Sequence, residues 1–130
     1  MGDVGSTLLG YNVAIFTIYY ADQEAGNLWV WIILFGLFWF DATLTLFRRY
    51  RNKEKLSEAH KKHVYQRLNQ SGWSHSKVVL WSMAVNAVLF LFAWIAMQKP
   101  SLSLIIFGFS VIFLYLVVRY VDGRKAFSKS

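Results

Sequence analysis

The sequence predicts an all-α, polytopic membrane protein with about four transmembrane helices and an amphipathic cytoplasmic helix. Three observations carry this prediction. Of the 130 residues, 56% are hydrophobic, which is more than a soluble domain of this length has the interior to bury. The apolar residues fall in long blocks: 28–47 holds one charge, Asp41, and 78–97 and 102–118 hold none. As helices, such blocks are long enough to cross a bilayer core of roughly 30 Å.

These blocks predict a single membrane domain over 1–130, with four spans at about 6–21, 28–47, 77–97 and 102–121. The first span is at the low limit of length and is expected to be thin or partly re-entrant. Asp3 stands where a cleaved signal peptide would carry positive charge, so this block is not expected to be a signal peptide. Pro100 breaks the chain between the last two spans, and Ser101 is expected to cap the last helix.

The distribution of charge predicts an orientation. The net charge is +7, and nine of the fourteen Lys and Arg residues lie in 48–77, with four more in the last twelve residues. By the positive-inside rule, loop 48–76 and the C-terminus are cytoplasmic, and an even number of spans puts Met1 there too. Because the positive charge follows the loops of a membrane protein, membrane lipid is the expected partner and nucleic acid is not.

The cytoplasmic loop contains a candidate amphipathic helix, capped by Ser57, running to Gln70 and ended by Gly72. A helical wheel gives it a wet face of Glu58, Lys61, Lys62, Tyr65, Gln66 and Asn69. The opposite face holds Leu56, Val64 and Leu68 together with His60, His63 and Arg67. The three cationic or titratable groups on the apolar face could bind an anion, or they could simply touch lipid headgroups.

Several ionisable residues could carry chemistry. Asp41 lies within a span, where an acid is either functional or orders a helix end; Arg48 is about 10 Å further along the axis, so a partner for Asp41 is expected from another helix or from water. The pair His60 and His63 is weak evidence for a metal, since no third ligand accompanies it. The chain has no cysteine, which excludes disulfides and thiolate chemistry. The basic cluster over 48–55 is either a lipid-facing topology signal or a diphosphate site.

Two motifs resemble a known family. The first is Met1-Gly2-Asp3-Val4-Gly5-Ser6, and the second combines Asp41-Ala42-Thr43-Leu44-Thr45-Leu46, Arg48-Arg49, Ala59-His60-x-x-His63-x-Tyr65-Gln66-Arg67-Leu68 and Gly72-Trp73-Ser74. Both resemble the polyprenyl-phosphate N-acetylhexosamine-1-phosphate transferases, which are related to the phospho-MurNAc-pentapeptide translocase. The resemblance covers nearly the whole chain and is nearest to the subgroup that starts O-antigen and other surface polysaccharides.

The resemblance implies a function and a site. The family moves a sugar 1-phosphate from a UDP-sugar to polyprenyl phosphate in the bacterial inner membrane, releasing UMP. Carried over, Asp3 would be the catalytic residue that helps to hold Mg²⁺. The residues expected to contact the diphosphate or the sugar are His60, His63, Arg67, Arg48 and Arg49.

The chain also departs from the family pattern. Tyr65 and Gln66 stand where some relatives place further histidines, and no Asp-Asp pair occurs anywhere. Met1 coincides with a methionine inside the family motif, so the chain is expected to be a C-terminal part, inactive without an N-terminal half. The alternative is a non-catalytic four-helix membrane protein whose basic loop binds anionic lipid or a partner. A homodimer is left open.

Overall fold

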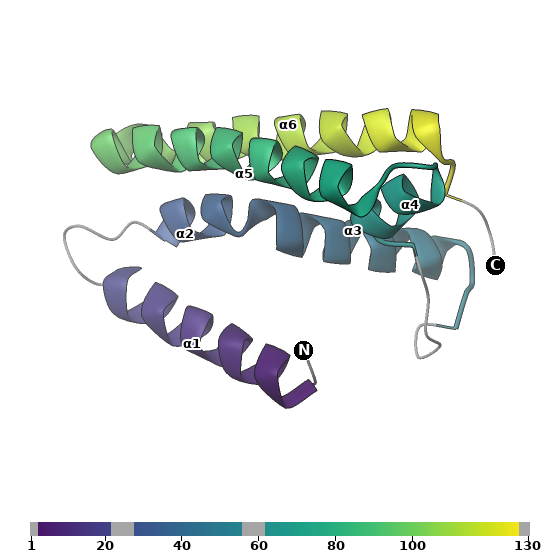
Figure 1. The fold of residues 1–130 in the computed structure, drawn as a ribbon. Helices are drawn as coiled ribbons and strands as arrows, with labels where there is room; N and C mark the ends of the chain where they lie inside the picture. Colours follow the sequence, from purple (N-terminus) through teal and green to yellow (C-terminus); the bar gives the residue numbers. More distant parts are fainter. Residues whose placement is uncertain (1–2, 22–27, 56–61, 128–130) are drawn as a thin grey trace.

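The computed structural model describes residues 3–21, 28–55 and 62–127, and in these residues every regular element is helical (Figure 1). The elements in chain order are α1 (Asp3–Ala21), α2 (Leu28–Leu34), α3 (Gly36–Arg51), α4 (Val64–Gln70), α5 (His75–Gln98), the 3₁₀ turn η1 (Pro100–Leu102) and α6 (Ser103–Arg124).

α5 and α6 form an antiparallel hairpin, which confirms the helices expected at 77–97 and 102–121. The Ser74 hydroxyl accepts a hydrogen bond from the Lys77 backbone N–H at 3.4 Å and so caps α5. The expected cap at Ser101 is wrong, because Pro100 starts a 3₁₀ turn that encloses Ser101. Instead, the buried Ser103 hydroxyl donates to the Ala96 carbonyl at 3.2 Å and ties the two helices together.

The helix expected over 28–47 is divided at Phe35, where the axes of α2 and α3 differ by 72°. Gly36 follows the bend and lies against two buried leucines: a Cβ on Gly36 would come within 3.1 Å of the nearest Leu114 side-chain carbon. The Trp39 indole N–H donates to the Ile32 carbonyl at 2.8 Å and so satisfies a backbone group beside the bend. The close packing of Gly36 against the two leucines therefore accompanies the bend. The continuous apolar sequence of 28–47 does not show where the helix divides.

The helices share one apolar interior in two parts. Ile33 of α2, Leu89 of α5 and Leu114 of α6 are at most 1% exposed and centre the first part. The second part joins α4 to α5 and α6 and consists of Val64, Leu68, Val78, Val118 and Val121. Most of the large apolar side chains on the outer faces of α5 and α6 remain exposed, as in helices that face lipid.

The all-α membrane class is confirmed, but with fewer clear spans than expected. Among the described helices, α5 and η1–α6 are each long and apolar enough to cross a bilayer, and α2 with α3 would make a third span if the bent pair is one. α1 is not among them, because polar residues such as Asn12 and Thr17 interrupt its apolar sequence. The span expected at 6–21 is thus a helix that falls short of this standard.

The helix expected within loop 48–76 begins later than expected. His63 is the N-cap of α4, and Lys62 before it is not helical, so no continuous helix runs from Ser57 to Gln70; residues 56–61 lie outside the described part. Gly72, at φ +92°, follows the end of α4 as expected.

Candidate functional site

The chemically distinctive part of the molecule is the end at which α4 lies, here called the loop end. The carboxyl ends of α3 and α6, the whole of α4 and the start of α5 gather there, and the amino end of α1 points to the same side (Figure 1). The opposite end of the α5–α6 pair, at η1, is here called the hairpin end. The arrangement brings most of the sequence-predicted site residues to one end.

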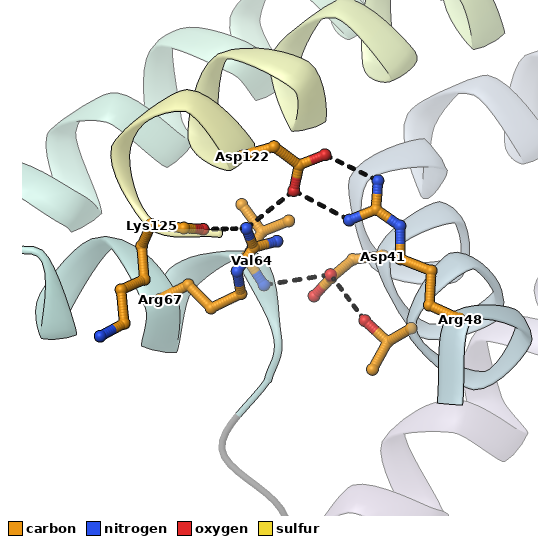
Figure 2. A network of polar contacts seen from close by, with 7 residues as sticks. Asp41, Arg48, Val64, Arg67, Asp122 and Lys125 are labelled. Carbon is orange, nitrogen blue, oxygen red and sulfur yellow. Dashed lines mark hydrogen bonds and ion pairs between the residues drawn. The ribbon is translucent and has the colours of Figure 1, made fainter. Parts of the chain in front are cut away.

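Asp122 of α6 links three helices at the loop end (Figure 2). Its two carboxylate oxygens accept hydrogen bonds from the two terminal nitrogens of Arg48 of α3, at 2.9 and 2.7 Å. One of these oxygens also accepts from Arg67 of α4 at 2.7 Å, and Arg67 donates further to the Lys125 carbonyl. Arg67 is only 3% exposed, so this carboxylate is what makes its burial tolerable.

Asp41 of α3 organises the start of α4. One of its oxygens accepts the Val64 backbone N–H at 3.1 Å and, more weakly, the Thr45 hydroxyl at 3.4 Å. The other oxygen lies 3.1 Å from Nδ1 of His63. Besides Thr45 of its own helix, Asp41 has the partners His63 and Val64 from outside that helix, as expected. Asp41 thus caps a helix that follows 23 residues later, which explains why α4 begins at Val64.

A second network holds the segment after α3. Arg49, which is buried, donates to Glu54 at 3.3 Å and also to the Lys55 carbonyl. Lys62 donates to the same Glu54 oxygen at 2.7 Å. The wet-face assignment of Lys62 is therefore wrong: its side chain is 15% exposed, because Glu54 draws it inward. Within α4 the wheel holds for Val64, Arg67 and Leu68, which are buried, and for Tyr65 and Asn69, which are exposed, whereas Gln66 of the expected wet face is half-buried.

Of the sequence-predicted site residues, the structure gathers Arg48, Arg49, His63 and Arg67 at the loop end, each against a carboxylate of the chain. His60 lies outside the described residues. Asp3 begins α1, but the structure does not describe its side chain. Substrate contacts of all six sequence-predicted site residues therefore stay predictions.

Sequence reasoning missed Asp122 and Glu54, the two acids that hold these cations. A signal was present for Asp122: it is the single acidic residue after Glu58, and it lies within a basic tail that contains Arg119 and Arg124. A single acidic residue among basic residues is expected to form ion pairs, although the sequence does not show which cations are its partners.

The expected Mg²⁺ site stays a prediction, because Mg²⁺ is commonly held by only one or two carboxylates together with substrate phosphates. Mg²⁺ is held by carboxylate and other oxygen ligands, but no three His, Cys, Asp or Glu residues gather within the described ranges. The carboxylates of Asp41, Glu54 and Asp122 each face cationic or N–H donors of the chain. The expectation of Mg²⁺ rests on Asp3 alone.

A comparison with known proteins adds a relative. The chain is similar to part of a sugar-phosphate transferase. A protein of Bacillus subtilis (strain 168), described as a probable undecaprenyl-phosphate N-acetylglucosaminyl 1-phosphate transferase, is 32% identical in an alignment of 123 residues that covers 90% of this chain. The chain spans 34% of the length of that relative. No family model and no solved structure matches the chain.

Proposed function

We propose that this chain is one part, the C-terminal part, of a transferase that moves a sugar 1-phosphate from a UDP-N-acetylhexosamine to polyprenyl phosphate. The observation that carries the proposal is the similarity over 90% of the chain to a transferase described as acting on undecaprenyl phosphate. The apolar helices suit a polyprenyl acceptor, which resides in the membrane.

The role proposed for this part is to hold the anionic donor at the loop end. Two guanidinium groups, of Arg48 and Arg67, share the single carboxylate of Asp122, so this trio keeps an excess positive charge. Arginine offers a fork of donors that matches phosphate oxygens. A diphosphate could therefore engage donors that Asp122 leaves unsaturated, with His63 nearby on Asp41.

The proposal includes an orientation in the bacterial cytoplasmic membrane. The loop over 48–76 and both termini face the cytoplasm, where UDP-sugars are made, because basic residues concentrate there. Single cysteines in place of Asn69 and Lys99, which are exposed at the loop end and the hairpin end, should be labelled from the cytoplasmic side and from the outside, respectively. Labelling of the Asn69 position from outside intact cells would contradict the orientation.

The chain by itself is expected to be inactive, since it lacks the paired aspartates of the transferases that it resembles. The decisive experiment supplies the part of the relative that this chain does not match. Membranes that contain this chain, the part of the Bacillus subtilis relative that it does not match, or both are given UDP-N-acetylglucosamine, undecaprenyl phosphate and Mg²⁺, and UMP release is measured. We expect UMP only from the pair.

Matched variants sharpen this experiment. His63→Ala should raise KM for the UDP-sugar more than it lowers kcat, because a contact with the ground-state donor contributes mainly to binding. Arg51→Ala is the control, since Arg51 is an exposed cation of the same basic cluster. If the chain inserts and folds but the pair releases no UMP, the proposal fails. The exposed cations Arg51, Lys53 and Lys55 would then favour a protein that binds anionic lipid.

A further inference from the structure

The last described residues, 125–127, turn back over the loop end. α6 ends at Arg124, and Lys125 is extended, at φ −143° and ψ 107°, so the chain leaves the helix there. The Lys125 carbonyl accepts a hydrogen bond from Arg67. The Phe127 ring is then 5.4 Å from the Arg48 guanidinium, 5.4 Å from the Lys62 ammonium and 5.6 Å from the Arg67 guanidinium.

These contacts bring three cations from three parts of the chain to one aromatic ring. Arg48 belongs to α3, Lys62 precedes α4 and Arg67 lies within it. A single ring attracts nearby cations through its quadrupole, but it neutralises none of their charge. Residues 125–127 thus cover the cations without supplying an acid.

Arg67 shows that this cluster has more donors than acceptors. Its Nε is buried and has no hydrogen-bond acceptor in the part of the chain that the structure describes. A buried guanidinium donor without an acceptor is costly. An anion with several oxygens would satisfy it far better than a backbone carbonyl and a ring face do.

We propose that residues 125–127 are a removable cover over an anion site formed by Arg48, Lys62 and Arg67, and that a diphosphate group displaces them. The inference rests on the proposed function, because it adds regulation to the same site. The tail and the anion compete for the same donors. The apparent Kd for the anion is then the intrinsic Kd divided by the fraction of molecules whose site is uncovered, and anion binding must displace the tail in return.

The competing explanation is that the tail is only a structural clamp between α6 and α4. The clamp and the cover predict different effects on stability and on anion affinity when the contacts of residues 125–127 are weakened. Loss of a clamp lowers stability and leaves anion affinity unchanged or worse. Loss of a cover improves anion affinity.

The test uses the full chain in lipid nanodiscs with inorganic pyrophosphate as the probe. Phe127→Leu keeps an apolar side chain but removes the ring that faces the cations. We expect it to lower the Kd for pyrophosphate about tenfold, as three partly shielded cation–π contacts would allow. Phe127→Tyr, which keeps a ring, should stay near the original Kd. Phe109→Leu on the exposed face of α6 is the matched control and should change nothing.

A second measurement follows the tail itself. The chain has no cysteine, so a spin label on Ala126→Cys reports this segment alone. The label should be slow without ligand and become mobile as pyrophosphate is added. An unchanged Kd for Phe127→Leu, a label that stays slow at saturating pyrophosphate, or the absence of pyrophosphate binding in every variant would overturn the proposal.

These outcomes separate the cover from the transferase. If the tail responds to pyrophosphate while the paired membranes release no UMP, the cover is right and the proposed function is wrong. If the pair releases UMP while Phe127→Leu leaves the Kd unchanged, the function stands and the tail is a clamp.

Discussion

The hairpin end and the loop end of the molecule are held together by different forces. At the hairpin end, η1 joins α5 to α6, and the Ser103–Ala96 hydrogen bond spans seven residues of sequence. Close-packed side chains such as Leu89 and Leu114 occupy the interior between them. At the loop end, Asp122 binds Arg48 and Arg67 across 74 and 55 residues. The hairpin end is thus held by contacts between residues close in sequence, and the loop end by ion pairs between residues far apart in sequence.

The difference has an energetic consequence. Between helices in a membrane, apolar side chains gain little by leaving lipid, so the hairpin end depends on shape and on small residues that allow close approach. At the loop end, removing one acid leaves buried cations behind, and an unpaired buried charge costs more than a lost contact. The free energy of unfolding should therefore fall most when a charged residue is removed at the loop end. In the apolar core near α2 it should fall most when side-chain volume is added.

The largest effect is expected from Asp122→Ala. It leaves Arg48 and the buried Arg67 without their shared carboxylate, and it should lower the free energy of unfolding by roughly 3 kcal/mol. Unfolding of the chain in detergent by SDS titration measures this. Lys99→Ala, an exposed cation at the hairpin end, is the control and should stay within about 0.5 kcal/mol. A loss below about 1 kcal/mol for Asp122→Ala would mean that solvent replaces the carboxylate and that the ends do not differ in this way.

A smaller effect is expected from Gly36→Leu. A side chain at this position meets Leu114 and Leu89, so the start of α3 must shift away from α5 and α6. Overpacking of this kind should cost about 2 kcal/mol in the same SDS titration. Gly108→Leu is the matched control, because nothing lies within 4 Å of a Cβ there. Equal losses for the two variants would show that Gly36 does not mark a packing restraint.

The smallest effect is expected from Asp41→Asn, which keeps an acceptor but loses the charge beside His63. It should weaken the start of α4 by about 1 kcal/mol and leave the hairpin unaffected. The Val64 backbone N–H donates a hydrogen bond to Asp41, so hydrogen exchange at this amide should become several-fold faster. Thr43→Ala, exposed on the same helix, should not change that rate. Faster exchange throughout α5 as well would show that Asp41 supports the whole fold and not only α4.

The site could be predicted only in part from the sequence. The family resemblance of the sequence indicated Arg48, His63 and Arg67, and the structure brings them to the same end of the molecule. Their carboxylate partners were not predicted, because partner choice depends on which helix ends meet. Lys62 was misplaced for a related reason: a helical wheel assumes a helix, whereas this residue precedes α4 and is drawn to Glu54.

The sequence by itself determined the all-helical membrane class and the helices α5 and α6, because long apolar blocks and a proline between them leave the backbone few alternatives. It also determined which side of α4 is buried, through a periodicity that involves only neighbouring residues. The tertiary structure alone decided the bend at Phe35, the start of α4 at Val64 and the partners of the buried arginines. Each of these depends on contacts between residues far apart in the chain, and such contacts leave no periodic trace in the sequence.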